Sequence, residues 1–498
     1  MAFIASHGRR RTRETAAGSS ASSAAAAFAM PLTSGAYTGI GQYFVRFRVG
    51  TPAQPFLLVA DTGSDLTWVK CRRPASASAP ANSSLSPADS GSGRAFRPED
   101  SRTWAPISCA SDTCTKSLPF SLATCPTPGS PCAYDYRKRR NGVPTPSLSE
   151  TCRFVSVCSP LFLPDYSSPI MSNVKGFAFA HKPVLESRHV PCTIYVTNRG
   201  AFYGRMQCRY KDGSAARGTV GTESATIALS GREERKAKLK GLVLGCTSSY
   251  TGPSFEASDG VLSLGYSGIS FASHAASRFG GRFSYCLVDH LSPRNATSYL
   301  TFGPTPAVSS SHASPSSCNA AAAPRARTTP LLLDRRMRPF YDVRLKAISV
   351  AGEFLKIPRA VWAVEAGGGV ILDSGTSLTV LAKPVSRAVV AALSKELAGL
   401  PRVTMDPFEY CYNWTSPSGE DADVAVPKMA VHFAGAARLE PPGKSYVIDA
   451  APGVKCIGLQ EGPWPGISVI GNILQQEHLW EFDIKNRRLR FQRSRCTH

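Results

Sequence analysis

Short apolar runs punctuate this chain, and two of them end in the same kind of turn. Residues 56–59 are Phe-Leu-Leu-Val and lead into Asp-Thr-Gly-Ser at residues 61–64. Residues 369–372 are Gly-Val-Ile-Leu and lead into Asp-Ser-Gly-Thr at residues 373–376. A short apolar run bounded by turn residues is typical of a buried strand. The sequence therefore predicts two buried strands, each of which delivers an aspartate into a tight turn.

The flanks of the two turns also match, because a Leu-Thr pair follows each of them at residues 66–67 and 378–379. In such a turn the glycine lets another backbone approach closely, and the hydroxyl residues can hold the carboxylate. Two unrelated strand-to-strand turns, the competing interpretation, would not share these flanks. We therefore predict two similar lobes that contribute Asp61 and Asp373 to one shared site.

The remaining patterns favour a fold built mainly from strands. Strands are expected at residues 42–50, 259–265, 299–303 and 340–350, and the clearest helix at residues 385–397. The chain contains 41 Gly and 38 Pro, which fits a fold with many turns. The expected class is all-β, mainly strands with few short helices.

The length of 498 residues exceeds that of an ordinary single domain, so at least two lobes are expected. Residues 1–34 lack periodicity and are interpreted as a disordered remnant of a propeptide. Residues 35–304 would form the N-terminal lobe and residues 329–498 the C-terminal lobe. Residues 305–328, which are rich in Ser, Ala and Pro, would form a low-complexity linker.

Charge and cysteine content indicate which partners and which cellular compartment to expect. The formal net charge is +22, but the basic residues cluster at the two ends and at residues 138–140, so we do not favour a nucleic-acid partner. Fifteen Cys, mostly in loop-like contexts, indicate disulfides and an oxidising compartment. Sequons at Asn82, Asn295 and Asn413 fit a secreted glycoprotein. Zinc-site spacing with His and a membrane-length apolar segment are both missing from the sequence, so we expect no metal, no cofactor and no membrane partner.

These motifs together resemble those of the pepsin-like (A1) aspartic proteases, and within them the plant nepenthesin-like branch. The resemblance rests on the two aspartate turns, on the Cys-rich loop after the first turn, and on the motifs at residues 283–287, 339–343, 470–472 and 475–476. It covers the chain from about residue 35 to the end, except for one segment. It implies a bilobal pepsin-like acid protease fold, with two β-barrel-like lobes and the active site between them.

The resemblance also implies an aspartic endopeptidase with an acidic pH optimum, in which Asp61 and Asp373 share a proton and activate a water. The first hydroxyl of each turn would brace the pair from below, the second would hydrogen-bond an outer carboxylate oxygen, and the glycines would permit close approach. These supporting residues are Thr62, Gly63, Ser64, Ser374, Gly375 and Thr376. Other carboxylates near the motifs, such as Asp259, are interpreted as turn or capping residues.

Members of this family cover the active site with a flap, in which Tyr210 would be the flap tyrosine and Trp68 its hydrogen-bond partner. A core position for Trp68 is the alternative. Residues 132–137 begin the flap pattern and residues 210–214 complete it, with the 72 residues 138–209 between them. This segment has little alternation, a basic excess and four extra Cys. We interpret it as a retained intron or another gene-model artefact, with a real inserted loop as the alternative.

Other functions stay open. Some relatives are non-catalytic proteins that inhibit plant-cell-wall-degrading enzymes, typically with damaged aspartate motifs, whereas both motifs are intact here. Another branch comprises DNA-binding proteases of chloroplast nucleoids. We expect protein or peptide substrates, a monomer, and the secreted, apoplastic or vacuolar setting that the family implies. The first residues are too short for a signal peptide, so we expect the true start upstream, with a chloroplast transit peptide as the alternative.

Overall fold

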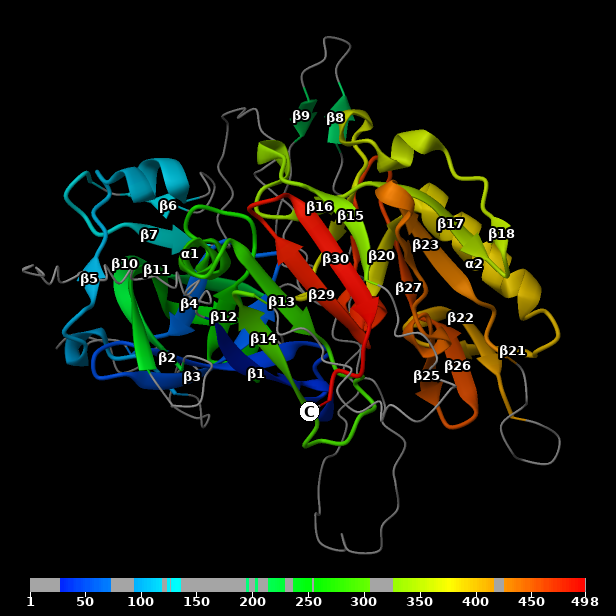
Figure 1. Ribbon diagram of the computed structural model, residues 1–498, viewed down its shortest axis with the longest axis horizontal. Helices are drawn as coiled ribbons and strands as arrows, with labels where there is room; N and C mark the ends of the chain where they lie inside the picture. The colour runs from blue at the N-terminus through cyan, green and yellow to red at the C-terminus, as the bar shows by residue number, and fades with distance from the viewer. Residues whose placement is uncertain are drawn as a thin grey trace, which may run out of the picture.

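Figure 1 shows the computed structural model of the chain, which describes residues 27–72, 94–118, 123–125, 127–135, 194–196, 202–204, 214–228, 236–252, 255–304, 326–415 and 425–497. Strands dominate these residues. Three short α-helices occur among them, namely α1 (Phe271–Arg278), α2 (Lys383–Glu396) and α3 (Asn472–Gln475). The predicted all-β class is confirmed.

A six-stranded antiparallel sheet joins the two halves of the chain. The first half contributes β1 (Phe28–Ser34), β13 (Arg282–Cys286) and β14 (Thr297–Phe302), and the second half contributes β15 (Arg327–Leu332), β29 (His478–Asp483) and β30 (Arg488–Arg493). The strand order is β1–β14–β13–β29–β30–β15. In Figure 1 the red strands β29 and β30 lie in the middle, between the blue-green and the yellow-orange parts.

Each half repeats one four-stranded arrangement around its aspartate turn. In the first half, β3 (Gln54–Asp61) pairs in parallel with β12 (Gly260–Ser263). Strand β12 pairs antiparallel with β4 (Thr67–Lys70), which pairs in parallel with β11 (Lys236–Thr251). In the second half, β19 (Val370–Leu372), β28 (Ser468–Ile470), β20 (Thr379–Ala382) and β27 (Leu459–Gly462) repeat these pairings in the same order. The repetition confirms the two similar lobes that the matched turns predict.

The strands that deliver the aspartates are buried because they lie inside these sheets. Leu58, Val59 and Ala60 before the first turn are at most 3% exposed, and the three residues of β19 are at most 1% exposed. Each strand has a neighbour along both edges, and its consecutive side chains are buried on both faces, which explains why both runs are continuously apolar rather than alternating.

The other strands extend these sheets or form small ones. They are β2 (Tyr43–Val49), β5 (Ala105–Pro106), β6 (Ala123–Thr124), β7 (Ala133–Asp135), β8 (Ile194–Val196), β9 (Phe202–Gly204), β10 (Ala215–Ala228), β16 (Tyr341–Val343), β17 (Leu345–Val350), β18 (Glu353–Phe354), β21 (Arg402–Met405), β22 (Phe408–Asn413), β23 (Met429–Phe433), β24 (Arg438–Leu439), β25 (Val447–Ala451) and β26 (Val454–Ile457). The short helical turns are η1 (Ala36–Thr38), η3 (Pro98–Asp100), η4 (Thr113–Ser117), η6 (Arg335–Met337), η7 (Arg359–Trp362), η8 (Val364–Ala366), η9 (Ala434–Ala436) and η10 (Gly443–Ser445).

Aromatic side chains from both halves pack across the central sheet. Phe283 stacks on Phe482 with ring centroids 4.8 Å apart, and the Tyr341 ring lies 4.9 Å from that of Phe482. The disulfide Cys286–Cys496 joins the same two halves. Burial of each ring contributes a few kcal/mol at roughly 25 cal/mol per Å², so the two lobes share one continuous core.

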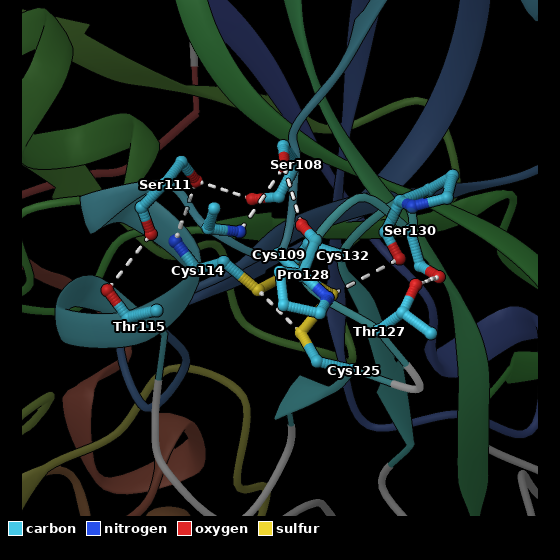
Figure 2. The surroundings of a disulfide bond; sticks show 12 residues. Ser108, Cys109, Ser111, Cys114, Thr115, Cys125, Thr127, Pro128, Ser130 and Cys132 are labelled. Atoms are coloured by element: carbon cyan, nitrogen blue, oxygen red, sulfur yellow. Dashed lines mark hydrogen bonds between the residues drawn. A yellow bond between two sulfur atoms is a disulfide. The ribbon is translucent and has the colours of Figure 1, made fainter.

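The predicted disulfides are confirmed, and ten of the eleven cysteines outside residues 138–209 are paired. The pairs are Cys71–Cys246, Cys109–Cys125, Cys114–Cys132, Cys286–Cys496 and Cys411–Cys456. Figure 2 shows the Cys-rich loop, where two disulfides interleave and the sulfurs of Cys114 and Cys125 lie 3.5 Å apart. The eleventh, Cys318, lies outside the described residues.

Two predicted boundaries need correction. Phe28–Ser34 form β1 rather than a disordered segment, because Phe28, Met30 and Leu32 alternate inward and the strand pairs with β14 and β2. Residues 1–26 lie outside the description. Strand β15 begins at Arg327, inside the predicted linker, because its backbone pairs with β30.

The predicted insert lies between two paired strands. Strand β7 pairs antiparallel with β10, with Tyr134 opposite Gly218. The chain leaves β7 after Asp135 and returns into β10 at Ala215, so the intervening residues join two neighbouring strands of a hairpin. Apart from the backbone of β8 and β9, residues 138–209 lie outside the description, and the origin of this segment stays a prediction.

Asp342 is a buried carboxyl group between β15 and β19, on strand β16. It pairs with Leu332 on one side and with Ile371 on the other, and it is 3% exposed. Burial raises the pKa of Asp342 from 3.8 to about 7, although a backbone hydrogen bond from Val370 acts in the opposite direction. A raised pKa means that the folded state holds the proton more tightly than the unfolded state. This stability is present at low pH and is lost as the pH rises from 3.8 to about 7.

We predict that Asp342→Asn, which cannot ionise, removes this pH dependence. Between about pH 4 and pH 7 the free energy of unfolding of the wild type should fall by about 4 kcal/mol relative to that of the variant. Denaturant unfolding at several pH values measures this difference. Asp449→Asn, a change at an exposed carboxylate, is the matched control. Parallel pH profiles for wild type and Asp342→Asn would contradict the prediction.

Candidate active site

The carboxyl groups of Asp61 and Asp373 lie side by side where the two lobes meet. A side-chain hydrogen bond joins them. Asp61 is 5% exposed and Asp373 is fully buried. Each carboxyl accepts a hydrogen bond from the glycine two residues later, Asp61 Oδ1 from Gly63 N and Asp373 Oδ1 from Gly375 N, both at 2.8 Å. The structure thus brings together two aspartates that the sequence places far apart.

Each glycine faces the aspartate of the other lobe. A Cβ at Gly63 would lie 2.9 Å from both carboxylate oxygens of Asp373, and a Cβ at Gly375 would lie 2.3 Å from Asp61 Oδ1. Both distances are shorter than real Cβ contacts. Any side chain at either position would push the two carboxyl groups apart.

Thr62 and Ser374 lock the two turns together beneath the carboxyl pair. Thr62 N donates to Ser374 Oγ at 3.0 Å, and Ser374 N donates to Thr62 Oγ1 at 2.9 Å. The Thr62 hydroxyl donates to Leu372 O at 3.2 Å, and the Ser374 hydroxyl donates to Ala60 O at 2.8 Å. All of these groups are buried, so separating the turns would leave several polar groups unsatisfied at about 1–3 kcal/mol each.

The second hydroxyls of the two turns make different contacts. Thr376 Oγ1 donates to Asp373 Oδ2 at 2.6 Å. Ser64 Oγ donates to the backbone carbonyl of Asp61 at 3.2 Å. The contact of Thr376 is the one that the sequence predicts, whereas the predicted contact of Ser64 with an outer carboxylate oxygen stays a prediction.

The electrostatics of the pair favour one shared proton. Burial raises the pKa of Asp373 well above its usual range, and the negative charge of Asp61 raises it further. The hydrogen bonds from Thr376 and Gly375 stabilise the ionised form and partly oppose this effect. Because two adjacent carboxyl groups cannot both ionise easily, the titration belongs to the pair. One carboxyl of the pair can therefore donate a proton while the other accepts one.

Side chains that the sequence reasoning left without a role hold the second turn from behind. Asn472 Nδ2 donates to Ser374 O at 3.0 Å and to Gly41 O at 2.7 Å. Ser377 Oγ donates to the same Gly41 carbonyl at 2.7 Å. Gly41 belongs to the first lobe, so these bonds connect the Asp373 turn to the opposite lobe.

A second chain of hydrogen bonds reaches the backbone of Asp373. Gln475 Nε2 donates to Asp373 O at 3.3 Å and to Ile470 O at 2.8 Å, and Tyr285 Oη donates to Gln475 Oε1 at 2.5 Å. The motifs that contain Tyr285, Asn472 and Gln475 were visible in the sequence. A local pattern does not reveal that Tyr285 meets a residue 190 positions away.

His290 is a buried histidine beside this network. Its Nδ1 lies 2.7 Å from Ser34 Oγ, and its ring stacks on Tyr43 with centroids 4.9 Å apart. Burial lowers the pKa of His290 from 6.5 to about 4, and the neighbouring Asn472 and Asp289 partly oppose this shift. The imidazole is therefore neutral over most of the acidic range.

Trp68 lies in the core of the first lobe. It is 1% exposed, and its ring makes an edge contact with Phe255 at a centroid distance of 4.9 Å. Tyr210, its predicted partner, lies outside the described residues. The core position of Trp68 is therefore observed, and the flap contact stays a prediction.

Asp259 is the structural carboxylate that the sequence predicts. Its Oδ2 accepts the amide of Leu57 at 2.8 Å and its Oδ1 accepts that of Arg94 at 3.2 Å. The bond to Leu57 holds the middle of β3, the strand that carries Asp61. Asp259 is therefore a buried carboxylate outside the pair, and its variant can serve as a control for variants of Asp61 and Asp373.

Within the described part of the chain, one group of residues has the spacing of metal ligands, formed by Cys109, Cys114 and Cys125. All three sulfurs are bonded in disulfides, which removes the thiolates that a metal would need. No helix among the described residues is long and apolar enough to cross a membrane.

Comparisons with known proteins agree with this architecture. A family model described as "Xylanase inhibitor N-terminal" matches residues 43–156 and 197–304, and one described as "Xylanase inhibitor C-terminal" matches residues 340–493. The first match leaves out residues 157–196, which lie inside the predicted insert.

Plant proteins named as aspartic proteases are similar to the chain in sequence, and two solved structures are similar to it in fold. "Aspartyl protease family protein 2" of Arabidopsis thaliana is 28% identical over 476 residues, which cover 94% of this chain and 74% of that protein. "Aspartic proteinase nepenthesin-2" of Nepenthes gracilis is 24% identical over 463 residues, which cover 92% and 79%. The crystal structure of edgp has a TM-score of 0.58 at 18% identity and covers 95% of this chain and 98% of its own. Basic 7S globulin from soybean has a TM-score of 0.55 at 17% identity and covers 94% and 95%. These two structures support the fold alone.

We predict that Ser374→Ala destabilises the fold, because Thr62 N would lose its partner and stay buried. The free energy of unfolding should fall by about 2 kcal/mol. Ser374→Thr keeps the hydroxyl and should remain within about 1 kcal/mol of wild type. Denaturant unfolding of the two variants measures this. Equal stability of Ser374→Ala and wild type would show that the brace is dispensable.

We predict that His290→Gln makes the protein less sensitive to acid. The folded state disfavours the charged imidazole, so the wild type loses stability as the pH falls from 6.5 to about 4 and loses no more below that value. The loss should amount to about 3 kcal/mol relative to the variant. Unfolding free energies at about pH 7 and pH 4 provide the test, and an unchanged difference between these pH values would refute it.

Proposed function

Because this chain belongs to the pepsin-like (A1) aspartic proteases, in their plant nepenthesin-like branch, we propose that it is an aspartic endopeptidase. Asp61 and Asp373 would activate the water that attacks the peptide bond. The observation that carries this proposal is the buried, hydrogen-bonded carboxyl pair with its reciprocal brace. Such a pair has little structural use, because burying two carboxyl groups together is costly unless they share a proton.

The proposed reaction needs one ionised and one protonated carboxyl. The ionised carboxylate takes a proton from water while the oxygen of that water attacks the peptide carbonyl. The protonated carboxyl gives its proton to the carbonyl oxygen, which produces a tetrahedral gem-diol. Transfer of a proton to the amide nitrogen then allows the C–N bond to break. Because the pair must hold one proton, we expect the rate to fall as the pH rises and the second carboxyl ionises.

The remaining features of the proposal follow the family. Residues 28–304 and 327–498 would act as the two lobes, protein or peptide chains would be the substrates, and the enzyme would be a secreted or vacuolar monomer. Trp68 and Tyr210 would belong to the flap. The plant proteases among the relatives support this setting.

A second candidate is a non-catalytic binding protein, because both matching family models are described as parts of a xylanase inhibitor. The intact pair favours the protease. The two candidates differ in one outcome, which is cleavage of peptides by the wild type.

We predict that Asp61→Asn and Asp373→Asn each lower kcat by about 10³-fold or more, because one of the two proton transfers is lost. Pepstatin should block the wild type. Hydrolysis of a fluorogenic peptide across about pH 3–7 measures both effects. Asp259→Asn changes a structural carboxylate and should keep most of the activity. Undiminished cleavage by either variant of the pair would refute the assignment, and a wild type that binds peptides without cleaving them would favour the second candidate.

A further inference from the structure

Arg338 belongs to a segment of the second lobe that contacts the loop beside the first aspartate turn. The residue after it, Pro339, accepts the amide of Tyr266 through its carbonyl at 2.6 Å. The amide of Gly265 donates to Ser64 O at 3.0 Å, and a Cβ at Gly265 would lie 2.4 Å from Ser64 O and 2.8 Å from Pro339 O. The backbone next to Arg338 therefore contacts the loop that contacts Ser64, three residues beyond Asp61.

The Arg338 side chain is half-buried and positively charged, yet its Nε has no partner. The Cζ atom lies 5.1 Å from the ring centroid of Tyr266, over the ring face. Its Nε is buried and makes no hydrogen bond, and among the described residues no carboxylate forms an ion pair with Arg338. A buried donor without a partner is costly and needs an explanation. No carboxylate of the described residues neutralises the guanidinium, which leaves its charge to an acceptor from outside the chain.

The neighbouring residues hold Arg338 in place without neutralising it. Arg336 Nη2 lies 2.6 Å from Asp334 Oδ2 and 3.1 Å from Glu365 Oε1, so these two carboxylates are already engaged. Met337 and Phe340 are buried on either side. The segment is therefore anchored, and the guanidinium stays available at the junction.

We propose that Arg338 is a specificity-determining residue that binds an acidic side chain of the substrate, Glu or Asp, a few positions from the scissile bond. This inference rests on the proposed protease function. The planar guanidinium presents paired N–H groups that match a carboxylate. The segment of Arg338 reaches Ser64 through Gly265, and Ser64 follows Asp61 by three residues, so a substrate side chain bound at Arg338 would belong to a residue near the reacting one.

The preference of Arg338 for an acidic substrate side chain should depend on pH. A substrate Glu ionises near pH 4, so it can form an ion pair with the guanidinium only above about that value. Preference for Glu over Gln should therefore grow as the pH rises through that value, while the rate itself falls. A preference that came from side-chain shape alone would not change with pH.

The experiment uses fluorogenic peptides that carry Glu or Gln at one scanned position, over about four positions on each side of the bond. At one or two positions kcat/KM should be about tenfold higher for Glu at about pH 5.5, and nearly equal at about pH 3. Arg338→Gln should abolish this preference, so that its kcat/KM values for the Glu and Gln peptides become nearly equal at both pH values. Arg335→Gln, which removes an exposed charge from the same segment, should keep it.

The outcomes separate the inference from the protease proposal. Cleavage without a pH-dependent preference for Glu, or an unchanged preference in Arg338→Gln, overturns the inference alone. Failure of the wild type to cleave any peptide overturns both. If Arg338→Gln does not fold, Arg338→Lys decides, since a point charge without the planar fork should keep a smaller preference with the same pH dependence.

Discussion

Two carboxyl groups held in contact inside a protein are the constraint on which this structure depends. Their burial is tolerable only if they share a proton and if their positions are fixed by other bonds. Thr62 and Ser374 supply those bonds, because each donates its amide to the hydroxyl of the other. Since the two residues belong to different lobes, the pair exists only while the lobes stay docked. The central six-stranded sheet and its aromatic core serve that requirement.

The predictions for Ser374 and the carboxyl pair rest on features that the sequence could reveal only in part. Matched apolar runs before Asp61 and Asp373 were enough to predict two buried strands and a two-lobed fold, because parallel strands covered on both faces are continuously apolar. The role of Gln475 was not predictable, since its bonds join segments whose sequence patterns carry no sign of each other. Strand β1 is hard to predict although Phe28, Met30 and Leu32 alternate inward, because its short apolar run directly follows residues that have no pattern.

Two buried groups that titrate outside the pair work in opposite directions between about pH 4 and pH 7. As the pH falls through this range, protonation of His290 lowers the free energy of unfolding, whereas protonation of Asp342 raises it. Their effects, about 3 and 4 kcal/mol, nearly cancel over this range. The two groups therefore compensate for each other over this range.

Burial alone does not distinguish a functional carboxyl group from a structural one. Asp342 is buried and has a raised pKa, yet backbone hydrogen bonds and two flanking strands account for its position. Asp373 differs, because the charge of a second carboxyl contributes to its shift and a glycine is required on each side to admit that neighbour. A perturbed carboxyl alone therefore indicates only burial. A perturbed carboxyl whose partner comes from the opposite lobe, through two turns that admit no side chain at Gly63 or Gly375, is the arrangement that supports the proposed proton transfer.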